Sequence, residues 1–220
     1  DTRRIQFRSV RVLRLREGDP VVLFDGRGGE YEARLFMPGR NQVNAEIGAH
    51  RQIERESPLA VTLVQAVSSG EKMDFTIQKA VELGVAAIQP VLTAKSVVRL
   101  DGERGAKKLV HWRRVAIAAC EQCGRNRIPE IGEPLPLERY QPRGQSSKIV
   151  LSPASDATLG SLAKGPVTLA VGPEAGFSPK EESMLKRAGF VPVRLGQRIL
   201  RTETAALAAL AALNALQGDF

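Results

Sequence analysis

Two patterns of hydrophobic and polar residues follow one another along the chain, and the pattern changes in the charged stretch of residues 51–58. Before it, the apolar runs 21–24 and 31–36 flank a turn rich in glycine, which predicts a β-hairpin. A further strand is expected near residues 41–47. We therefore predict a small β-barrel domain over residues 1–57.

After this boundary, apolar runs typical of strands alternate with patterns typical of helices. The expected strands are residues 59–67, 87–92, 148–151, 167–171 and 191–195, and the expected helices are residues 72–83, 106–123, 179–188 and 203–217. Such alternation favours an α/β fold with a mostly parallel sheet, whose ligands bind beyond the carboxyl ends of the strands. We predict this domain over residues 58–220, with a surface loop at residues 134–147.

The composition points to an ordinary globular protein, with 43% hydrophobic and 25% charged residues. No apolar run is long enough to cross a bilayer, so we expect a soluble, cytoplasmic protein without membrane contacts. Cys120 and Cys123 are too few for a disulfide framework or a four-thiolate zinc site, and no metal is expected. We place both cysteines, with Trp112 and Phe75, in the core.

Positive charge is the first functional indication. The formal net charge is +8 and the isoelectric point is near 9.9, which favours polyanionic partners such as nucleic acid. Two basic groups stand out: six arginines within the first sixteen residues, and a mid-chain group of Lys107, Lys108, Arg113, Arg114, Arg125 and Arg127. An ordinary solvated surface is the alternative interpretation of both.

The loops after the last two expected strands hold the most unusual residues. The first is Gly-Pro-Glu-Ala-Gly-Phe at 172–177, followed by Ser178, Pro179 and Glu181, which predict the start of a helix with a capping box. Its glycines allow close approach of the backbone to a flat ligand, although any tight turn also uses them. The dinucleotide fingerprint, the phosphate loop and the nucleophile elbow of hydrolases are all absent.

Taken together, residues 172–177, residues 195–210 (LGQRILRTETAALAAL) and residues 118–125 (AACEQCGR) closely resemble the RsmE family of the SPOUT superfamily. Members are S-adenosylmethionine-dependent methyltransferases that modify N3 of a uridine in 16S ribosomal RNA. The resemblance spans nearly the whole chain. It implies a PUA-like RNA-binding barrel, a SPOUT domain with a trefoil knot around the cofactor, and a homodimer. One position departs from the family, because Ala175 stands where a glycine is usual.

The resemblance also implies which residues bind the cofactor, mainly through their backbone groups. They are Leu151, Ser152, Gly172, Pro173, Glu174, Gly176, Leu195, Gly196, Ile199, Leu200, Thr204 and Ala205.

For catalysis, N3 of uracil must lose a proton before it becomes a good nucleophile. Arg201 is our first candidate, because a guanidinium beside the cofactor loop can hold the uracil oxygens as negative charge develops. Glu203 or Glu174 would orient Arg201 or accept the proton. An ordinary ion pair between Arg201 and Glu203, or a helix-dipole role for Glu203, remains the structural alternative.

The substrate is expected to be 16S ribosomal RNA or the small ribosomal subunit. Candidate RNA-binding residues are Arg3, Arg4, Arg11, Arg14, Gln122 and Arg125. Three alternatives stay open: an RNA-binding module without catalysis, a nucleotide-using α/β enzyme, and a SPOUT methyltransferase that acts on another RNA nucleotide. The second is disfavoured because the chain lacks a phosphate loop.

Overall fold

The computed structural model describes residues 15–39, 42–96, 98, 100, 102–161 and 165–220. Contacts within the chain divide it into two compact units. The small unit contains the described residues up to 55 together with residues 124–128, and the large unit contains residues 56–123 and 129–220. Each unit is described separately below.

The small unit is built on an antiparallel sheet of three strands in the order β1 (Pro20–Leu23), β2 (Glu30–Gly39) and β3 (Gln42–Arg51). Leu35 and Val43 are buried, and Leu15, Val21 and Met37 pack against them. Residues two apart on a strand face the same side, so the apolar residues of β2 and β3 share one face. The predicted hairpin and the third strand are both confirmed.

A short segment from much later in the chain completes the small unit. Arg127 forms β-bridges with Gly26 and Arg27, and the amide of Ile128 donates to the carbonyl of Gly26 at 3.1 Å. The buried side chain of Asn126 donates to the carbonyl of Ile53 at 2.6 Å. Residues 124–128 therefore belong to the small unit although the residues on both sides of them belong to the large one.

The large unit contains a parallel sheet in the order β10, β8, β9, β4, β5, β6, with the short strand β7 also paired to β5. The strands are β4 (Val61–Ala66), β5 (Ala87–Leu92), β6 (Glu130–Ile131), β7 (Leu135–Pro136), β8 (Ser147–Leu151), β9 (Val167–Val171) and β10 (Val191–Val193). All five residues of β9 are buried, as expected for a central strand covered on both faces.

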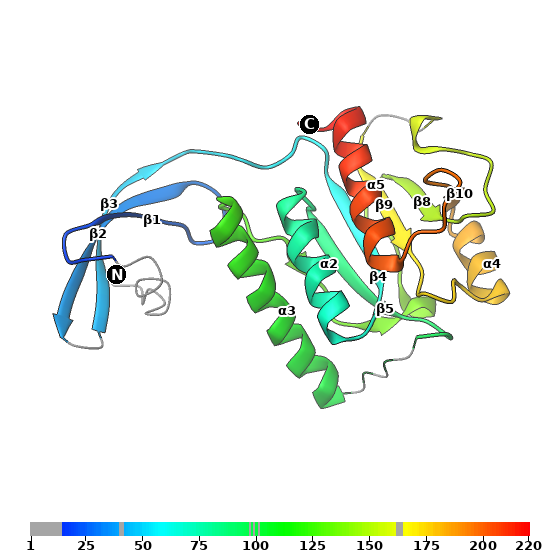
Figure 1. Ribbon diagram of the computed structural model, residues 1–220, viewed down its shortest axis with the longest axis horizontal. Coiled ribbons are helices and arrows are strands. Elements are labelled where there is room, and N and C mark those ends of the chain that lie inside the picture. The colour runs from blue at the N-terminus through cyan, green and yellow to red at the C-terminus, as the bar shows by residue number, and fades with distance from the viewer. Residues whose placement is uncertain (1–14, 40–41, 97, 99, 101, 162–164) are drawn as a thin grey trace. The chain divides into compact units, whose positions relative to one another are not determined.

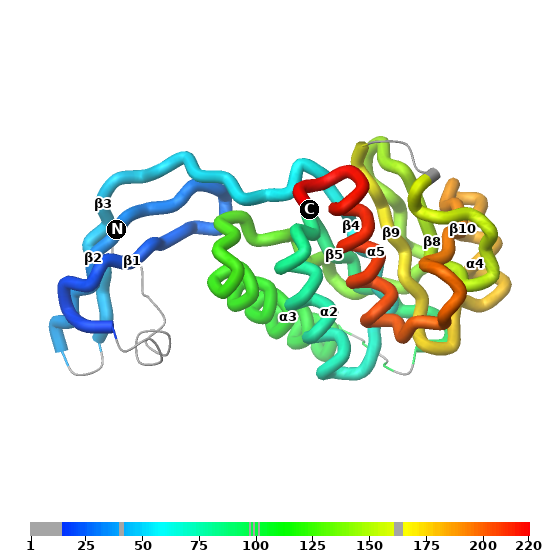
Figure 2. The backbone as a smooth tube through the Cα atoms, turned by 45° about the horizontal axis from the view of Figure 1, so that its top comes forward, coloured from blue at the N-terminus to red at the C-terminus, as the bar shows by residue number. Residues whose placement is uncertain are grey.

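Helices cover both faces of this sheet. Figures 1 and 2 show α2 (Gly70–Glu82), α3 (Gly102–Cys123) and α5 (Thr202–Gln217) on one side, and α4 (Pro179–Arg187) on the other. On α2, Met73, Ile77 and Ala80 follow helical spacing and are fully buried. The predicted α/β architecture is confirmed.

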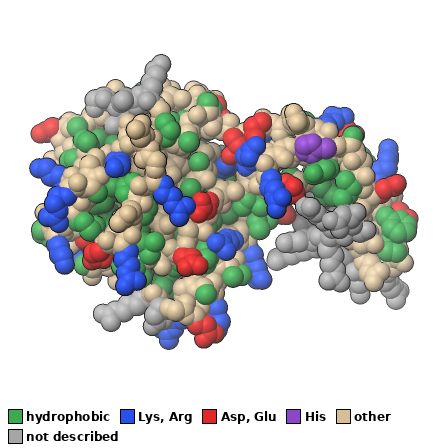
Figure 3. Space-filling view, turned by 180° about the vertical axis from the view of Figure 1, so that it is seen from behind, with side chains coloured by type: hydrophobic (Ala, Val, Ile, Leu, Met, Phe, Trp, Pro, Cys, Tyr) green, Lys and Arg blue, Asp and Glu red, His purple; other side chains and the backbone are tan. Residues whose placement is uncertain are grey.

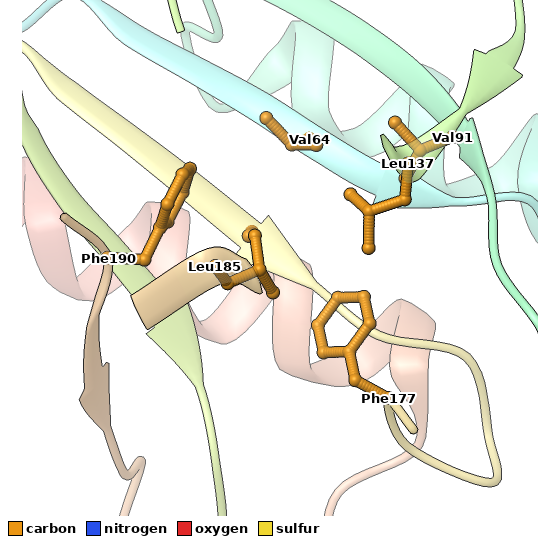
Figure 4. Close-up of a cluster of buried hydrophobic side chains, with 7 residues drawn as sticks. Val64, Val91, Leu137, Phe177, Leu185 and Phe190 are labelled. Carbon is orange, nitrogen blue, oxygen red and sulfur yellow. The ribbon is translucent and has the colours of Figure 1, made fainter. Parts of the chain in front are cut away.

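The core on the α4 side is drawn in Figure 4. Phe177, Leu185 and Phe190 pack there against Val64 of β4 and Leu137, which lies in a short 3-10 helix, η1 (Leu137–Arg139). The predicted capping box at the start of α4 is present. The Ser178 side chain accepts from the backbone of Glu181, and the Glu181 side chain accepts from the backbone of Ser178. Local residues alone are enough to predict this helix start.

Two expectations about burial are wrong. Residues 134–147 do not form a surface loop throughout, since β7 pairs with β5 and Leu137 is fully buried. Phe75 is 46% exposed rather than in the core, because it lies on the outer face of α2. Trp112 and Cys120 are buried on α3 as predicted, whereas Cys123 is half-buried.

The chain crosses the large sheet once more near its end. After β10, at one edge of the sheet, it returns to form α5, which packs against α2 and against the central strands β4 and β9. The trefoil knot implied by the family resemblance stays a prediction. Within the described ranges, no helix is long and apolar enough to span a bilayer.

Candidate active site

Three loops leave the same edge of the large sheet. Strands β10, β8 and β9 are adjacent and parallel, so the segments that follow Leu151, Val171 and Val193 begin side by side (Figure 1). The amide of Ser152 donates to the carbonyl of Val193 at 2.9 Å, which ties the first of these segments to the third. This edge is where an open parallel sheet binds its ligands.

The loop after β9, residues 172–177, makes a tight turn with a buried end. The amide of Gly176 donates to the carbonyl of Pro173 at 2.8 Å, and Gly176 has a φ of +69°. Phe177 then enters the core that Figure 4 shows. A Cβ on Gly172 would lie 3.2 Å from the Phe177 ring, so glycine allows the loop to fold back this closely.

A buried threonine connects this loop to two other elements. The Thr202 hydroxyl, at the first residue of α5, donates to the carbonyl of Gly172 at 2.7 Å. It also accepts from the Gln65 side chain of β4 at 3.0 Å. Neither residue was predicted as part of the site, because the sequence does not show that the end of β4 and the start of α5 meet.

The loop after β10 holds its own left-handed glycine. Gly196 has a φ of +91°, and a Cβ placed on it would contact nothing within 4 Å. The side chain of Ile199 in this loop is 85% exposed. The chain then enters α5, where the amide of Ala205 donates to the carbonyl of Arg201 at 2.8 Å. Thr204 is exposed on the first turn of the helix.

Glu174, in the loop after β9, pairs with a residue that was not predicted. Its carboxylate accepts from the Lys72 ammonium of α2 at 2.8 Å. This hydrogen bond, together with the backbone N–H of Glu174 itself, holds the pKa of the Glu174 carboxyl below its ordinary value. A lower pKa makes a carboxylate a weaker proton acceptor.

Arg201 and Glu203 are arranged differently. Arg201 is the exposed N-cap residue of α5, and Glu203 lies in the first turn of that helix. Among the described residues, the two side chains form no ion pair with each other, and the buried oxygen Oε2 of Glu203 has no hydrogen-bond partner. The pKa of nearby Lys72 is raised, mainly by its hydrogen bond to Glu174. The Glu203 carboxylate also raises this pKa, whereas the Arg201 guanidinium lowers it. A guanidinium and a carboxylate are thus available beside the loop edge.

The fold explains this geometry, and comparison with known proteins supplies the family. A model described as RNA methyltransferase domain matches residues 55–214, and one described as RNA methyltransferase PUA domain matches residues 10–48. The ribosomal RNA small subunit methyltransferase E of Buchnera aphidicola (from Schizaphis graminum) is 37% identical, and the match covers 95% of this chain and 87% of that protein. The chain belongs to the ribosomal RNA small subunit methyltransferase E family. This confirms the resemblance to RsmE proteins that the motifs indicated.

Solved structures agree with this family membership. The small subunit methyltransferase E of Neisseria gonorrhoeae, determined with bound S-adenosyl methionine, is 41% identical and has a TM-score of 0.91, covering 100% of this chain and 94% of that one. A Legionella pneumophila protein, determined with its bound cofactor SAM, has the same identity and TM-score, covering 96% and 88%. The predicted pairing of a PUA-like N-terminal domain with a SPOUT-type α/β domain is therefore confirmed for this family member.

Of the predicted RNA-binding residues, four lie outside the part of the chain that the structure describes and two lie within it. Arg3, Arg4, Arg11 and Arg14 lie outside the described residues. Gln122 is exposed in the last turn of α3, whereas Arg125 is only 5% exposed. No cluster of three or more metal-ligating side chains occurs in the part of the chain that the structure describes.

A buried carboxylate in the first turn of α4 accepts hydrogen bonds from the residue that follows the loop after β9. Glu181 is 2% exposed and accepts from the Ser178 amide at 2.7 Å, from the Ser178 hydroxyl at 2.8 Å and from the Ala94 amide at 2.8 Å. Burial alone would raise the pKa of Glu181, but these donors and the nearby Lys95 charge hold it below the ordinary 4.5. This carboxylate joins the turn after β5 to α4.

We expect Glu181→Gln to destabilise the protein by about 2 kcal/mol at pH 7, since hydrogen bonds to a charged group are lost. For a chain of this size, that corresponds to a fall in Tm of about 5 °C. A lowered pKa stabilises the fold above the ordinary value and loses this effect as the pH falls through the lowered one. The Tm difference should therefore shrink towards pH 3, and the exposed neighbour variant Glu182→Gln should show no such difference. An equal loss at pH 7 and pH 3 would refute the role of the charge.

Proposed function

We propose that this protein transfers a methyl group from S-adenosylmethionine to N3 of a uridine in 16S ribosomal RNA. The observation that carries the proposal is the loop edge of the large sheet, where Arg201 and Glu203 stand beside the glycine loops without pairing to each other within the described part of the chain. Family membership supports the same reaction class, because a 41% identical relative was determined with S-adenosyl methionine bound. RNA as the substrate also agrees with the net charge of +8.

The residues at this edge fit a flat cofactor. Gly176 and Gly196 have positive φ, and the space where a Cβ would stand is open at both, so a ligand can approach the backbone closely. The exposed apolar side chain of Ile199 offers a surface for the adenine ring. We assign cofactor binding to the twelve residues implied by the family motifs, from Leu151 to Ala205. When bound, S-adenosylmethionine supplies a methyl group already activated by its sulfonium.

In the proposed mechanism, the chain positions the base and manages one proton. The guanidinium of Arg201 donates to the uracil oxygens and stabilises the negative charge that develops when N3 loses its proton. The Glu203 carboxylate accepts that proton, since the half-buried side chain lies in the first turn of α5 close to Arg201 and forms no ion pair with it among the described residues. Glu174 serves better as a structural anion, because Lys72 lowers its pKa. Arg201 and Glu203 would thus prepare N3 to receive the methyl group that bound S-adenosylmethionine would supply.

The outer face of α3 is a second basic surface for the RNA. Lys107 and Arg114 lie two turns apart and point away from the buried side of the helix, which carries Leu109 and Trp112. Lys107 pairs with the exposed Glu103, at 2.7 Å, and such exposed pairs are weak. Basic side chains also recur over the face of the large unit that Figure 3 shows. We infer that these cations contact RNA phosphates.

We expect the double variant Lys107→Gln/Arg114→Gln to weaken the binding of 16S RNA fragments to a similar extent, whatever the sequence of the fragment. The slope of log affinity against log salt should fall by about 1 for each phosphate contact that is lost. Filter binding at several salt concentrations measures both effects, and Lys180→Gln on α4 is the matched control. An unchanged slope with the double variant would show that α3 does not contact the RNA.

We also infer a homodimer in the cytoplasm, where ribosomal RNA is modified. Large apolar side chains outside the proposed cofactor site stay exposed on two elements of the large unit: Val191 of β10 at 52% and Leu216 of α5 at 52%. Exposed apolar surface commonly marks an interface between subunits where such side chains gather. Sedimentation equilibrium would give twice the chain mass if the dimer exists. A single-chain mass at micromolar concentration would contradict it.

The proposed function is tested first by calorimetric titration with S-adenosylmethionine and S-adenosylhomocysteine, with ATP and NAD as controls. Selective binding of the first two is expected. Methylation is then assayed on 16S RNA and on small ribosomal subunits, and the modified nucleotide is identified by mass spectrometry. Lack of cofactor binding would favour an RNA-binding module without catalysis, and methylation elsewhere would identify a SPOUT methyltransferase acting on another nucleotide.

A further inference from the structure

We propose that two lysines, Lys72 and Lys95, act as positioning residues that clamp the loop of residues 172–177 from two sides. Neither lysine is among the residues that the family motifs assigned to the cofactor or the base. The inference rests on the proposed function in one respect, that this loop binds the cofactor. It adds that both ammonium groups help to hold the loop in its binding shape, so that losing either one weakens cofactor binding.

Lys95 holds the loop by its backbone. Its ammonium donates to the carbonyl of Ala175 at 3.0 Å and to the carbonyl of Phe177 at 3.3 Å. Hydrogen bonds from a charged donor are stronger than those between neutral groups. One side chain therefore spans three residues of the loop, on either side of the left-handed Gly176.

The backbone of Lys95 is itself fixed. It lies in a turn in which the Ser96 amide donates to the Thr93 carbonyl at 3.0 Å and the Thr93 amide donates to the Ser96 hydroxyl at 3.1 Å. The amide of Ala94 is held by the buried Glu181 of α4 at 2.8 Å. Because the backbone of Lys95 is held in place, less order must be gained when its ammonium binds the loop. We therefore expect the two contacts of Lys95 to set the position of the loop.

Lys72 holds the loop by a side chain. It lies in the first turn of α2, and its ammonium is 2.8 Å from Oε1 of Glu174. Lys72 and Glu174 are 36% and 43% exposed, so this pair contributes little to the stability of the fold. Its effect is expected instead on the shape of the loop, because Glu174, Ala175 and Gly176 are all exposed and are not fixed by burial in the core.

The clamp acts where the loop is otherwise least constrained. The start of the loop is held by Thr202, which donates to the Gly172 carbonyl, and its end is held by the buried Phe177. Between these points, the bond from the Gly176 amide to the Pro173 carbonyl constrains the turn from within. The two lysines supply external constraints on this middle part. Preorganisation of a binding loop raises affinity, because less order must be gained when the ligand binds.

The experiment compares Lys95→Met and Lys72→Met with the unchanged protein. Methionine keeps the length of the side chain and removes the ammonium. We expect the Kd for S-adenosylhomocysteine to rise by about tenfold in Lys95→Met and about threefold in Lys72→Met, which reflects two charge-assisted bonds against one exposed ion pair. At saturating S-adenosylmethionine, kcat should stay within about twofold, so the change lies in KM.

Three further variants distinguish the clamp from a general loss of positive charge. Lys180→Met on α4 removes an exposed lysine that does not contact the loop, and its Kd should not change. The exchange Lys72→Glu/Glu174→Lys restores the ion pair in reverse and should recover most of the lost affinity, since the proposed contact of Glu174 with the cofactor is made by its backbone. Lys95→Arg keeps donors for both carbonyls and should bind more tightly than Lys95→Met. Tm is measured for each variant, so that a loss of folding is recognised.

Each outcome decides between two possibilities. An unchanged Kd in a folded Lys95→Met protein overturns the clamp. A fall in kcat without a change in Kd for Lys72→Met also overturns it, because Lys72 would then act on the reacting base near Arg201. Failure of the proposed function looks different, since the unchanged protein itself would not bind S-adenosylhomocysteine.

Discussion

Replacing Arg201 with alanine should lower kcat by about 100- to 1,000-fold, the usual cost of removing one donor that stabilises developing charge. The affinity for S-adenosylhomocysteine should change by less than about threefold, since no cofactor contact depends on the guanidinium in the proposed mechanism. The reason is geometric. Arg201 is exposed, is the N-cap residue of α5, and is not neutralised by Glu203 among the described residues. Single-turnover methylation of 16S RNA together with calorimetry measures both quantities.

The matched control is Arg198→Ala, which removes an exposed arginine three residues earlier in the same loop. If Arg201 acted only through the general positive charge of the loop, the two variants would lose turnover to a similar extent. Arg201→Lys should recover only part of the activity, because an ammonium cannot make the paired contacts of a planar guanidinium. Full activity in Arg201→Ala would show that this residue takes no part in the mechanism.

A valine at position 196 should abolish measurable cofactor binding, with a Kd for S-adenosylhomocysteine raised by at least about 100-fold. Gly196 has a φ of +91°, and a β-branched residue there costs roughly 1–3 kcal/mol in backbone strain or forces the loop into another shape. The added side chain would also occupy the open space beside this backbone, where the cofactor is proposed to lie. Backbone strain and steric exclusion of the cofactor therefore both raise the Kd.

Gly144→Val separates these two effects. Gly144 also has a positive φ, of +67°, and open space around a Cβ, but it lies in the segment between η1 and β8, away from the three loops. Its valine variant should lose stability to a similar extent, as a lower Tm, while it binds S-adenosylhomocysteine normally. Equal losses of affinity in both variants would mean that the result for Gly196 comes from general destabilisation and not from the site.

Much of the fold could be predicted because it depends on local patterns. The capping box at Ser178 and Glu181 requires only residues three apart, and it is present as predicted. The helix over residues 72–83 was likewise predicted from its pattern, and the structure has α2 there, with Met73, Ile77 and Ala80 on its buried face. The expectations that are wrong depended on tertiary packing. Leu137 is buried because η1 packs against α4 and against Val64 and Val91 of the sheet, and no periodic pattern in residues 134–147 indicates these contacts.

In the candidate site, too, some features could be predicted from local patterns and others depend on tertiary packing. The glycine loops could be located from the sequence because they follow strands whose carboxyl ends must share one edge of a parallel sheet. Their supports could not, since Lys72, Lys95 and Thr202 reach the loop of residues 172–177 from the start of α2, the turn after β5 and the start of α5. The contacts join residues from 30 to 102 positions apart in the chain.

By itself, the sequence determined the family, the alternation of the main strands and helices, and the loops that carry the chemistry, because motifs and periodicity are properties of neighbouring residues. Only the tertiary structure decided which charges are already paired. It placed Lys72 against Glu174 and left the Glu203 oxygen without a donor among the described residues, and it joined residues 124–128 to the small unit. Pairing of charges depends on which distant elements pack together, and that is decided by the whole fold.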